Sequence, residues 1–250
     1  MEKPLAVVIM AAGKGTRMKN PAVAKVMYAI NAKPMVDYVV DLAMQLHSAK
    51  IVVVVGWQGE SVIEHLAARA KEIVCVEQKP QCGTGHAVMQ TEAVLSGFEG
   101  DVLVLSGDVP LLSYATTRNL IDLHRTHKAT ATVLTAHLED PTGYGRIMRN
   151  ADGSVRMIVE QKDASDEQRL VREINSGIYV FTKRHLFEAL GQIKPSNKQN
   201  EYYLTDVFGY FWKNGLAVHA IAARTPNEVM GINTPEQLEE ARVIISGGNS

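Results

Sequence analysis

Cysteine is scarce in this sequence: Cys75 and Cys82 are the only two cysteines in 250 residues. Two thiols do not make the disulfide framework of a small secreted domain, and they suit a reducing compartment. Long apolar runs are missing as well. The run at residues 5–12 ends at Gly13 and Lys14, too early for a signal-peptide core, and no stretch approaches the roughly 18 apolar residues of a membrane span. We therefore expect a cytoplasmic protein with no membrane partner.

The chain also lacks an excess of either charge, a Pro/Gly-rich linker, an internal repeat and any low-complexity segment. A net charge of -1 and a pI of about 6.7 disfavour nucleic acid as the main partner. Hydrophobic residues make up 46% and charged residues 21%, which is ordinary for a globular chain with a substantial core. We expect a single domain over residues 1–246, followed by a disordered tail at 247–250.

Short apolar runs that end in glycine or polar residues predict buried strands in the first half of the chain. They lie at residues 5–10, 51–55, 73–77 and 102–105, and helical spacing of apolar residues appears at 35–46, 61–70, 86–95 and 116–128. This alternation predicts an α/β fold with a parallel, doubly wound sheet and helices on both faces. Ligands bind beyond the carboxyl ends of such strands, which is where Gly13 and Asp108 fall.

The second half has a more mixed pattern. Strands are predicted at 131–137, 174–181 and 216–222, helices at 184–190 and 205–214, and a hairpin joins 144–149 to 155–160 through Asp152-Gly153. Residues 163–172 are charged and are expected to be exposed. We interpret this half as an elaboration of the same domain, which makes the sheet mixed.

A glycine-bearing loop follows the first predicted strand, at residues 10–18 (MAAGKGTRM). Glycines let backbone N–H groups approach a polyanion, and Lys14 and Arg17 add positive charge. The Walker pattern is absent, and Met18 stands where the dinucleotide fingerprint needs glycine. The loop is therefore interpreted as a phosphate-binding element of another kind, or as a connector that only turns the chain. Lys25 follows closely, either as a second phosphate contact or as an ordinary surface lysine.

Several other polar residues lie at strand ends or in turns. Asp108, after the strand at 102–105, is a natural Mg²⁺ ligand, or else a cap of the next helix. Asn233 offers an amide oxygen to the same site, or simply forms a turn. Gln78 and the turn at 83–86 (GTGH) offer amide and backbone groups to a base or sugar. No Gly-x-Ser-x-Gly nucleophile elbow is present, consistent with direct transfer without a covalent intermediate.

These motifs occur in a set order that resembles the uridylyltransferase domain of the bacterial bifunctional enzymes that make UDP-N-acetylglucosamine, a family with a Rossmann-like nucleotidyltransferase fold. The resemblance runs from about Ala6 to Asn233. It rests on the loop, Lys25, Gln78, Gly83-Thr84 and the segments at 107–111 (GDVPL), 141–147 (PTGYGRI), 160–164 (EQKDA), 173–177 (EINSG), 201–206 (EYYLTD) and 231–233 (GIN).

The resemblance implies a mostly parallel mixed sheet flanked by helices, and conversion of UTP and N-acetylglucosamine 1-phosphate to UDP-N-acetylglucosamine and pyrophosphate, with Mg²⁺ as cofactor. It implies a nucleotide-binding half at residues 1–112 and a sugar-binding half at 113–233. The residues it implies are Ala11, Ala12, Gly13, Gly15, Gln78, Gly83 and Thr84 for the nucleotide, Gly145, Glu160 and Asn175 for the sugar, Asp108 and Asn233 for the metal, and Arg17 and Lys25 as catalytic phosphate contacts.

The sequence departs from the family pattern at a few positions. Ala24 stands where the family usually has proline, Val23 where it has leucine, and Ser106 where an aromatic residue precedes the Gly-Asp pair. No hexapeptide repeat of the family's β-helix acetyltransferase domain is found, so no acetyltransferase activity is expected. A related pyrophosphorylase with another nucleotide or sugar phosphate, and a non-catalytic nucleotide-sugar-binding module, remain alternatives, and the oligomeric state is open.

Overall fold

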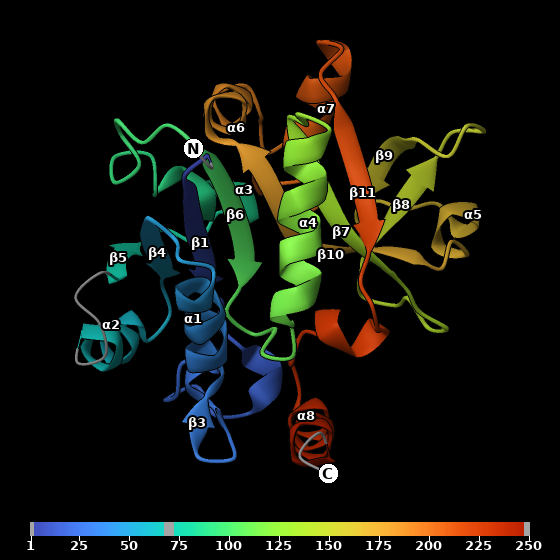
Figure 1. The fold of residues 1–250 in the computed structure, drawn as a ribbon. Helices are drawn as coiled ribbons and strands as arrows, with labels where there is room; N and C mark the ends of the chain where they lie inside the picture. Colours follow the sequence, from blue (N-terminus) through green and yellow to red (C-terminus); the bar gives the residue numbers. More distant parts are fainter. Residues whose placement is uncertain (1–2, 68–72, 248–250) are drawn as a thin grey trace.

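A computed structural model describes residues 3–67 and 73–247 of the chain. Within them, one nine-stranded sheet forms the centre of the molecule, with the strand order β11-β7-β10-β6-β1-β4-β5 and with β8 and β9 branching from β10 (Figure 1). The strands are β1 (Leu5–Ala11), β4 (Lys50–Val55), β5 (Ile73–Glu77), β6 (Asp101–Ser106), β7 (Ala131–His137), β8 (Gly145–Arg149), β9 (Val155–Val159), β10 (Glu173–Thr182) and β11 (Val218–Ala222).

The first-half strands run parallel: β1 pairs with β4 and β6, and β4 pairs with β5. Strand β10 lies antiparallel between β6 and β7, and β11 returns parallel to β7. The predicted fold class, a mostly parallel mixed sheet flanked by helices, is confirmed. Since β1 lies between β4 and β6, chain connections leave it in both directions, and this switch point opens a crevice at its carboxyl end.

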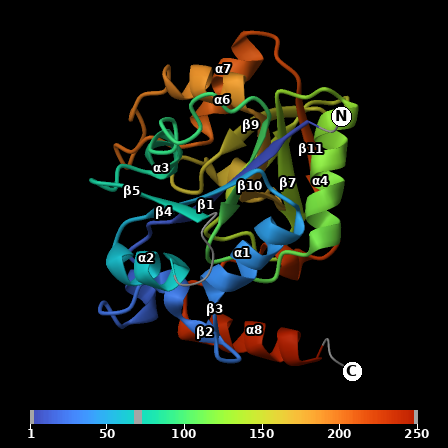
Figure 2. The same ribbon diagram turned by 60° about the vertical axis from the view of Figure 1, so that its left-hand side comes forward.

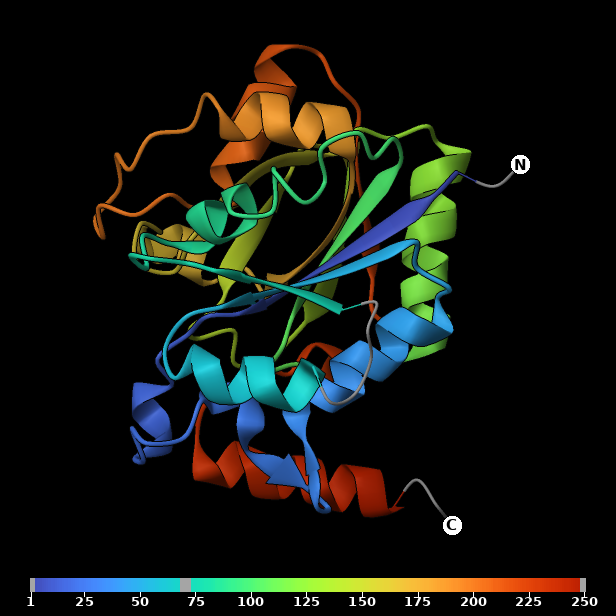
Figure 3. The same cartoon turned by 90° about the vertical axis from the view of Figure 1, so that its left-hand side faces the viewer.

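Helices cover both faces of the sheet because successive side chains of a buried strand point to opposite sides. On β1, Val7 and Ile9 pack with one group of helices, whereas Ala6 and Val8 pack with the other. Figure 3 shows the resulting layers, with α1 and α4 on one side and α3 and α6 on the other. The helices are α1 (Met35–Gln45), α2 (Gly59–Ala67), α3 (Thr84–Met89), α4 (Tyr114–Thr126), α5 (Asp166–Arg169), α6 (Lys183–Leu190), α7 (Asp206–Lys213) and α8 (Pro235–Gly247).

The structure corrects some predicted helices. The helix predicted at 86–95 is shorter: α3 ends at Met89, and the chain then forms turns, because the N–H groups of Gln90 and Thr91 bond to carbonyls three residues back instead of four. Helix α8 was not predicted, and Gly247, assigned to the tail, is its last residue. The rest of the tail, 248–250, and the end of the helix predicted at 61–70 lie outside the described residues.

Helix α8 packs beside the hairpin of β2 (Ala29–Ile30) and β3 (Lys33–Pro34), below the sheet in Figure 2. A small third core joins Leu238 and Ala241 of α8 to Ile30 of β2 and Met18. Met18 closes the short helix η1 (Thr16–Met18) of the predicted phosphate loop. The end of the chain is thereby packed against that loop. No helix in the described part of the chain has the length and apolarity needed to cross a bilayer.

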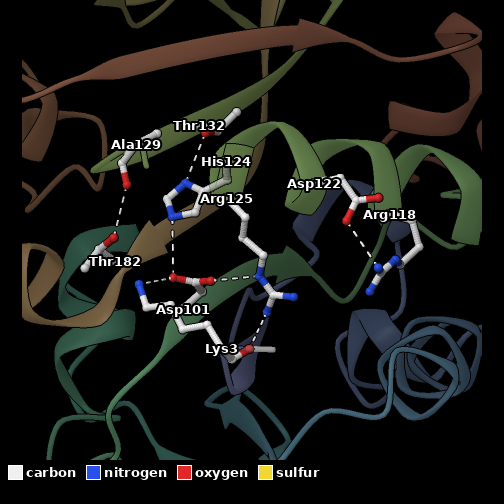
Figure 4. A network of polar contacts seen from close by, with 9 residues as sticks. All are labelled: Lys3, Asp101, Arg118, Asp122, His124, Arg125, Ala129, Thr132 and Thr182. Carbon is white, nitrogen blue, oxygen red and sulfur yellow. Dashed lines mark hydrogen bonds and ion pairs between the residues drawn. The ribbon is translucent and has the colours of Figure 1, made fainter. Parts of the chain in front are cut away.

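The opposite end of the sheet is held by a buried polar network around Asp101, the first residue of β6 (Figure 4). Its carboxylate lies 2.6 Å from Lys3 Nζ, accepts a hydrogen bond of 3.0 Å from Arg125 Nε, and lies 3.5 Å from His124 Nε2. Burial opposes ionisation, but hydrogen bonds from these partners outweigh it and hold the pKa of Asp101 at about 2. The network therefore adds stability above pH 3.8 that is lost as the pH falls toward 2.

Candidate active site

The loops after β1 and β6 meet at one edge of the sheet because the two strands are parallel neighbours (Figure 1). Met10 is paired with Ser106 near the ends of these strands. Two cavities open there, with volumes of about 440 Å³ and about 190 Å³. Met10, Thr84 and Ser106 line both of them. The two cavities therefore adjoin, and together they form one cleft.

The larger cavity gathers most of the predicted nucleotide residues: Ala12, Gly13, Gln78, Gly83 and Thr84 line it. The structure does not bring the other two to its wall. The side chain of Ala11 packs in the core under the sheet, and Gly15 lies against Lys25 instead. If these two residues contribute to ligand binding, they do so through the backbone and the shape of the loop.

Gln78 and the turn after it form the far wall of the larger cavity. The side chain of Gln78 is buried, and its Nε2 donates to the carbonyl of Gly83 at 2.8 Å. Gly83 has a φ of 102°, and a Cβ there would lie 2.6 Å from the carbonyl oxygen of Tyr202. Only glycine fits such a position. Leu204 N–H donates to Thr84 Oγ1 at 3.0 Å, which ties this wall to the second half of the chain.

The smaller cavity contains all three predicted sugar residues, Gly145, Glu160 and Asn175. Gly145 of β8 pairs directly with Asn175 of β10. Strand β10 bulges after Asn175, whose Nδ2 donates to the hydroxyl of Tyr179 at 2.7 Å. A β-bulge redirects side chains at a strand's end, and this one lies at the cavity wall. The arrangement offers amide and carboxylate groups to a polar ligand.

Glu160 contributes a carboxyl group to this smaller cavity. Burial raises the pKa of its carboxyl; a hydrogen bond of 3.0 Å from the Thr205 hydroxyl opposes that rise, and the carboxylates of Asp206 and Asp163 add to it. A carboxyl with a raised pKa is destabilising when ionised: the cost is full above the raised value, shrinks as the pH falls below that value, and is gone below the ordinary pKa of 4.5. Such a cost is typical of functional positions.

We expect Glu160→Gln to raise the melting temperature at pH 7.5 by about 2–4 °C, the shift given by about 1 kcal/mol in a chain of this size. Glutamine keeps the acceptor for Thr205 and removes the buried charge. This gain in melting temperature should shrink as the pH is lowered toward the acid range. Calorimetry at several pH values measures it, with Glu240→Gln on the exposed side of α8 as the matched control. A lower melting temperature for Glu160→Gln at neutral pH would contradict this view of Glu160.

A polar cluster beside the larger cavity brings together the remaining predicted residues. Lys25, in the short helix η2 (Lys25–Met27), forms an ion pair with Asp108 and donates to Asn233 Oδ1 at 2.6 Å. Arg17 Nη2 donates to the same oxygen at 2.8 Å. Lys25 is only 9% exposed, and a buried ammonium needs such partners. Residues from distant parts of the chain thus converge on one point.

The oxygens of Asp108 and Asn233 suit a magnesium ion. Both lie against the single ammonium of Lys25, so they converge on one cation position. Mg²⁺ prefers oxygen ligands and is commonly held by one or two protein groups together with substrate phosphates. No cluster of three or more His, Cys, Asp or Glu side chains arranged for a metal occurs within the described ranges. The two oxygens around the Lys25 ammonium fit such an ion, which would displace that ammonium.

The loop itself depends on Gly15. Its φ is 60°, and a Cβ there would lie 2.7 Å from Cβ of Lys25. We expect Gly15→Ala to destabilise the protein by about 1–3 kcal/mol, measured by urea unfolding, because it adds both backbone strain and a clash. Gly13→Ala is the matched control, since a Cβ at Gly13 meets nothing within 4 Å. Equal losses for the two variants would contradict this role of Gly15.

Sequence reasoning missed some residues of the cleft. Gln81 lines the larger cavity and donates to the carbonyl of Ala12, which ties the start of the loop to the turn after β5. The sequence signal that could have identified Gln81 is its position in the same turn as Gln78. Tyr144 and Thr205 line the smaller cavity. Burial raises the pKa of Tyr144, so its hydroxyl stays protonated and can donate a hydrogen bond.

Similar proteins agree with this picture. The family model described as nucleotidyl transferase matches residues 6–226. The chain is 46% identical over 238 residues to the bifunctional protein GlmU of Enterococcus faecalis, covering 95% of this chain and 51% of that protein. It is 47% identical to the GlmU of Pelotomaculum thermopropionicum, with 94% and 51% covered. The chain thus spans about half the length of the curated relatives it matches.

Solved structures show the same fold at low identity. A UDP-glucose pyrophosphorylase complexed with UDP-glucose aligns with a TM-score of 0.77 and 22% identity, covering 99% of this chain and 100% of that one. A putative glucose-1-phosphate thymidylyltransferase from Bacillus anthracis aligns with a TM-score of 0.76 and 19% identity, covering 96% and 94%. Since the family model matches most of the sequence, the family resemblance is confirmed, and the chain belongs to the nucleotidyl transferase family.

Proposed function

We propose that this chain converts UTP and N-acetylglucosamine 1-phosphate to UDP-N-acetylglucosamine and pyrophosphate. The observation that carries the proposal is the single cleft, in which two adjoining cavities share Met10, Thr84 and Ser106 and the Lys25–Asp108 ion pair lies at the edge. One cavity suits a nucleotide and the other a sugar. We propose one catalytic domain at 1–246, with halves at 1–112 and 113–233, because strands from both halves share one sheet.

UTP is proposed to occupy the larger cavity. Gln78, Gly83 and Thr84 form its far wall and present amide, hydroxyl and backbone groups to the uracil. Ala12 and Gly13 form the near wall, where backbone N–H groups after a strand can meet phosphate oxygens. This arrangement would place the triphosphate toward Arg17 and Lys25, which carry the positive charge that a polyanion requires.

The sugar phosphate is proposed to occupy the smaller cavity, with Gly145, Glu160 and Asn175 against the amino sugar. A Cβ at Gly145 would lie 3.4 Å from Glu160 Oε2, so the glycine leaves room beside the carboxylate. Carboxylate and amide groups can hydrogen-bond to sugar hydroxyls and to an acetamido N–H. Each such hydrogen bond orients the ligand as well as binding it. Ser106, on the shared wall, would face the junction of the two ligands.

In the proposed reaction, an oxygen of the sugar phosphate attacks the α-phosphorus of UTP in line. The new oxygen–phosphorus bond forms as the bond to the bridging oxygen of the β-phosphate breaks, and pyrophosphate leaves with that electron pair. The attacking oxygen is already ionised, so no residue has to accept a proton. Arg17 and Lys25 position the phosphates and offset their charge, which is the main contribution a protein makes to such a transfer. Mg²⁺, held by Asp108 and Asn233, would supply further charge neutralisation on the phosphates.

The family membership and the fold of a UDP-glucose pyrophosphorylase support transfer to a sugar phosphate as a class. A related reaction with another nucleotide or sugar is the second candidate, and the observation that favours it is Ser106. Its small side chain lies where both cavities meet. A wider junction would tolerate a different sugar.

Pyrophosphate release tests the proposal directly. The protein is incubated with Mg²⁺ and each of UTP, CTP, dTTP and ATP against N-acetylglucosamine 1-phosphate and glucose 1-phosphate. We expect the highest kcat/KM for UTP with N-acetylglucosamine 1-phosphate. A higher value for another pair moves the assignment to that pair. Binding of UDP-N-acetylglucosamine without turnover of any pair favours the non-catalytic module.

We also propose that the reaction takes place in the cytoplasm, where nucleoside triphosphates and a reducing environment coincide. Cys75 and Cys82 support this setting, because both are free thiols. The proposed partners are UTP and the sugar 1-phosphate, and neither nucleic acid nor membrane belongs to the proposal.

A further inference from the structure

Trp57 occupies an unusual position in the turn between β4 and α2. It is 39% exposed although it is one of the largest apolar side chains, and it belongs to none of the described core clusters. Packing in the described core clusters therefore does not fix the position of this side chain. Its hydrogen bonds and its contact with a lysine lead to the phosphate loop, which we define from here on as residues 12–21.

Both ends of the phosphate loop are tied to Trp57. Its backbone N–H donates to the carbonyl of Ala12 at 3.3 Å, at the start of the loop. Its indole Nε1–H donates to the carbonyl of Pro21 at 3.0 Å, at the end of the loop. The neighbouring Gln58 reaches the Pro21 carbonyl at 3.4 Å. A single residue therefore closes the loop across its base.

The ring of Trp57 also contacts a cation of the loop. Lys14 Nζ lies 5.7 Å from the centre of the indole, within the range in which the ring face attracts an ammonium. Lys14 lines the larger cavity. The indole thus limits the positions of a long, flexible side chain at the mouth of that cavity. Limiting such freedom before binding lowers the entropy that binding must overcome.

We propose that Trp57 is a positioning residue that holds the phosphate loop closed at its base and Lys14 at the mouth of the nucleotide cavity. Its effect on catalysis rests on the proposed nucleotidyl transfer, whereas its effect on the loop does not. Trp57 touches no reacting atom in this scheme. Its side chain acts through the carbonyl of Pro21 and the ammonium of Lys14, and its backbone N–H, which Trp57→Ala and Trp57→Phe both keep, bonds to Ala12.

Limited trypsin digestion tests the loop directly, since Lys14, Arg17 and Lys19 are cleavage sites within it. We expect Trp57→Ala to increase cleavage at these three sites by about five- to tenfold, because cleavage of a native protein follows the open population of the segment. Trp57→Phe keeps a ring face but loses the indole N–H, so its cleavage rate should lie between those of the wild type and Trp57→Ala. The chain's other tryptophan, Trp212, packs on Phe208 in α7, and Trp212→Phe is the matched control with no change.

Kinetics supply the second measurement. In Trp57→Ala, KM for the nucleotide should rise about tenfold while kcat changes less than about threefold, because lost pre-organisation weakens ground-state and transition-state binding alike. In the Trp212→Phe protein, emission from Trp57 alone should change when nucleoside triphosphate binds and draws Lys14 away from the ring. Unchanged trypsin cleavage in Trp57→Ala overturns the proposal, even if the wild type transfers no nucleotide. Normal KM with a large fall in kcat overturns it too.

Discussion

Asp108→Ala is expected to reduce kcat by about 10³-fold while the protein stays folded. The carboxylate of Asp108, the charged one of the two proposed metal ligands, is paired with Lys25. A bound metal is worth several kcal/mol of charge stabilisation in such transfers, and each 1.36 kcal/mol is a factor of about ten in rate. The fold should survive because the side chain of Asp108 is partly exposed, and Lys25 retains its hydrogen bond to Asn233.

Initial rates of pyrophosphate release with Mg²⁺ and the preferred substrate pair measure this effect, and circular dichroism checks the fold. Asp108→Asn belongs beside it, since asparagine keeps the shape and an acceptor for Lys25 but loses the charge. Asp122→Ala is the control on a solvent-exposed face of α4, where the carboxylate pairs with Arg118. If Asp108→Ala keeps near-normal turnover that depends on Mg²⁺, the proposed role of Asp108 as a metal ligand is wrong, whereas the turnover itself would support the proposed reaction.

The place of the site was predictable because parallel strands bring their carboxyl ends to one edge. The apolar run before Gly13 and the run before Asp108 predicted strands, and the structure makes them neighbours with Met10 opposite Ser106. Local sequence patterns could not supply the contacts within the site, which only the family resemblance implied. Lys25 meets Asp108 and Asn233 across 83 and 208 residues, and nothing in local periodicity encodes contacts over such separations.

Two of the residues that sequence reasoning missed have a common physical cause. Gln81 and Trp57 act by donating hydrogen bonds to backbone carbonyls of the loop, at Ala12 and Pro21. Any residue type presents a backbone carbonyl, so no pattern of side chains marks the partner. Helix α8 was missed for a different reason, the distribution of its apolar residues. Val243 and Ile244 in it are exposed, so its apolar residues do not form the single stripe by which an amphipathic helix is recognised.

Lys25→Met is expected to have the second large effect, a fall in kcat/KM of about 10²–10³-fold, equivalent to about 2.7–4 kcal/mol of transition-state stabilisation. The same change should make the substrate-free protein bind Mg²⁺ more tightly, by about tenfold. Lys25 holds the oxygens of Asp108 and Asn233 in the absence of metal, and a charge-assisted bond of this kind must be given up before another cation can bind there.

The two measurements should therefore move in opposite directions. Isothermal titration with MgCl₂ alone gives the affinity for the metal, and pyrophosphate release gives turnover. Lys128→Met, an exposed lysine beyond the end of α4, is the control in which neither changes. If Lys25 served only the fold, its replacement would lower both the affinity for Mg²⁺ and the turnover. If it were a phosphate contact remote from the metal, its replacement would lower the turnover alone. Tighter binding of Mg²⁺ together with slower turnover is expected only if one ammonium serves both the metal oxygens and the phosphates. Weaker or unchanged binding of Mg²⁺ would rule out this double role of Lys25.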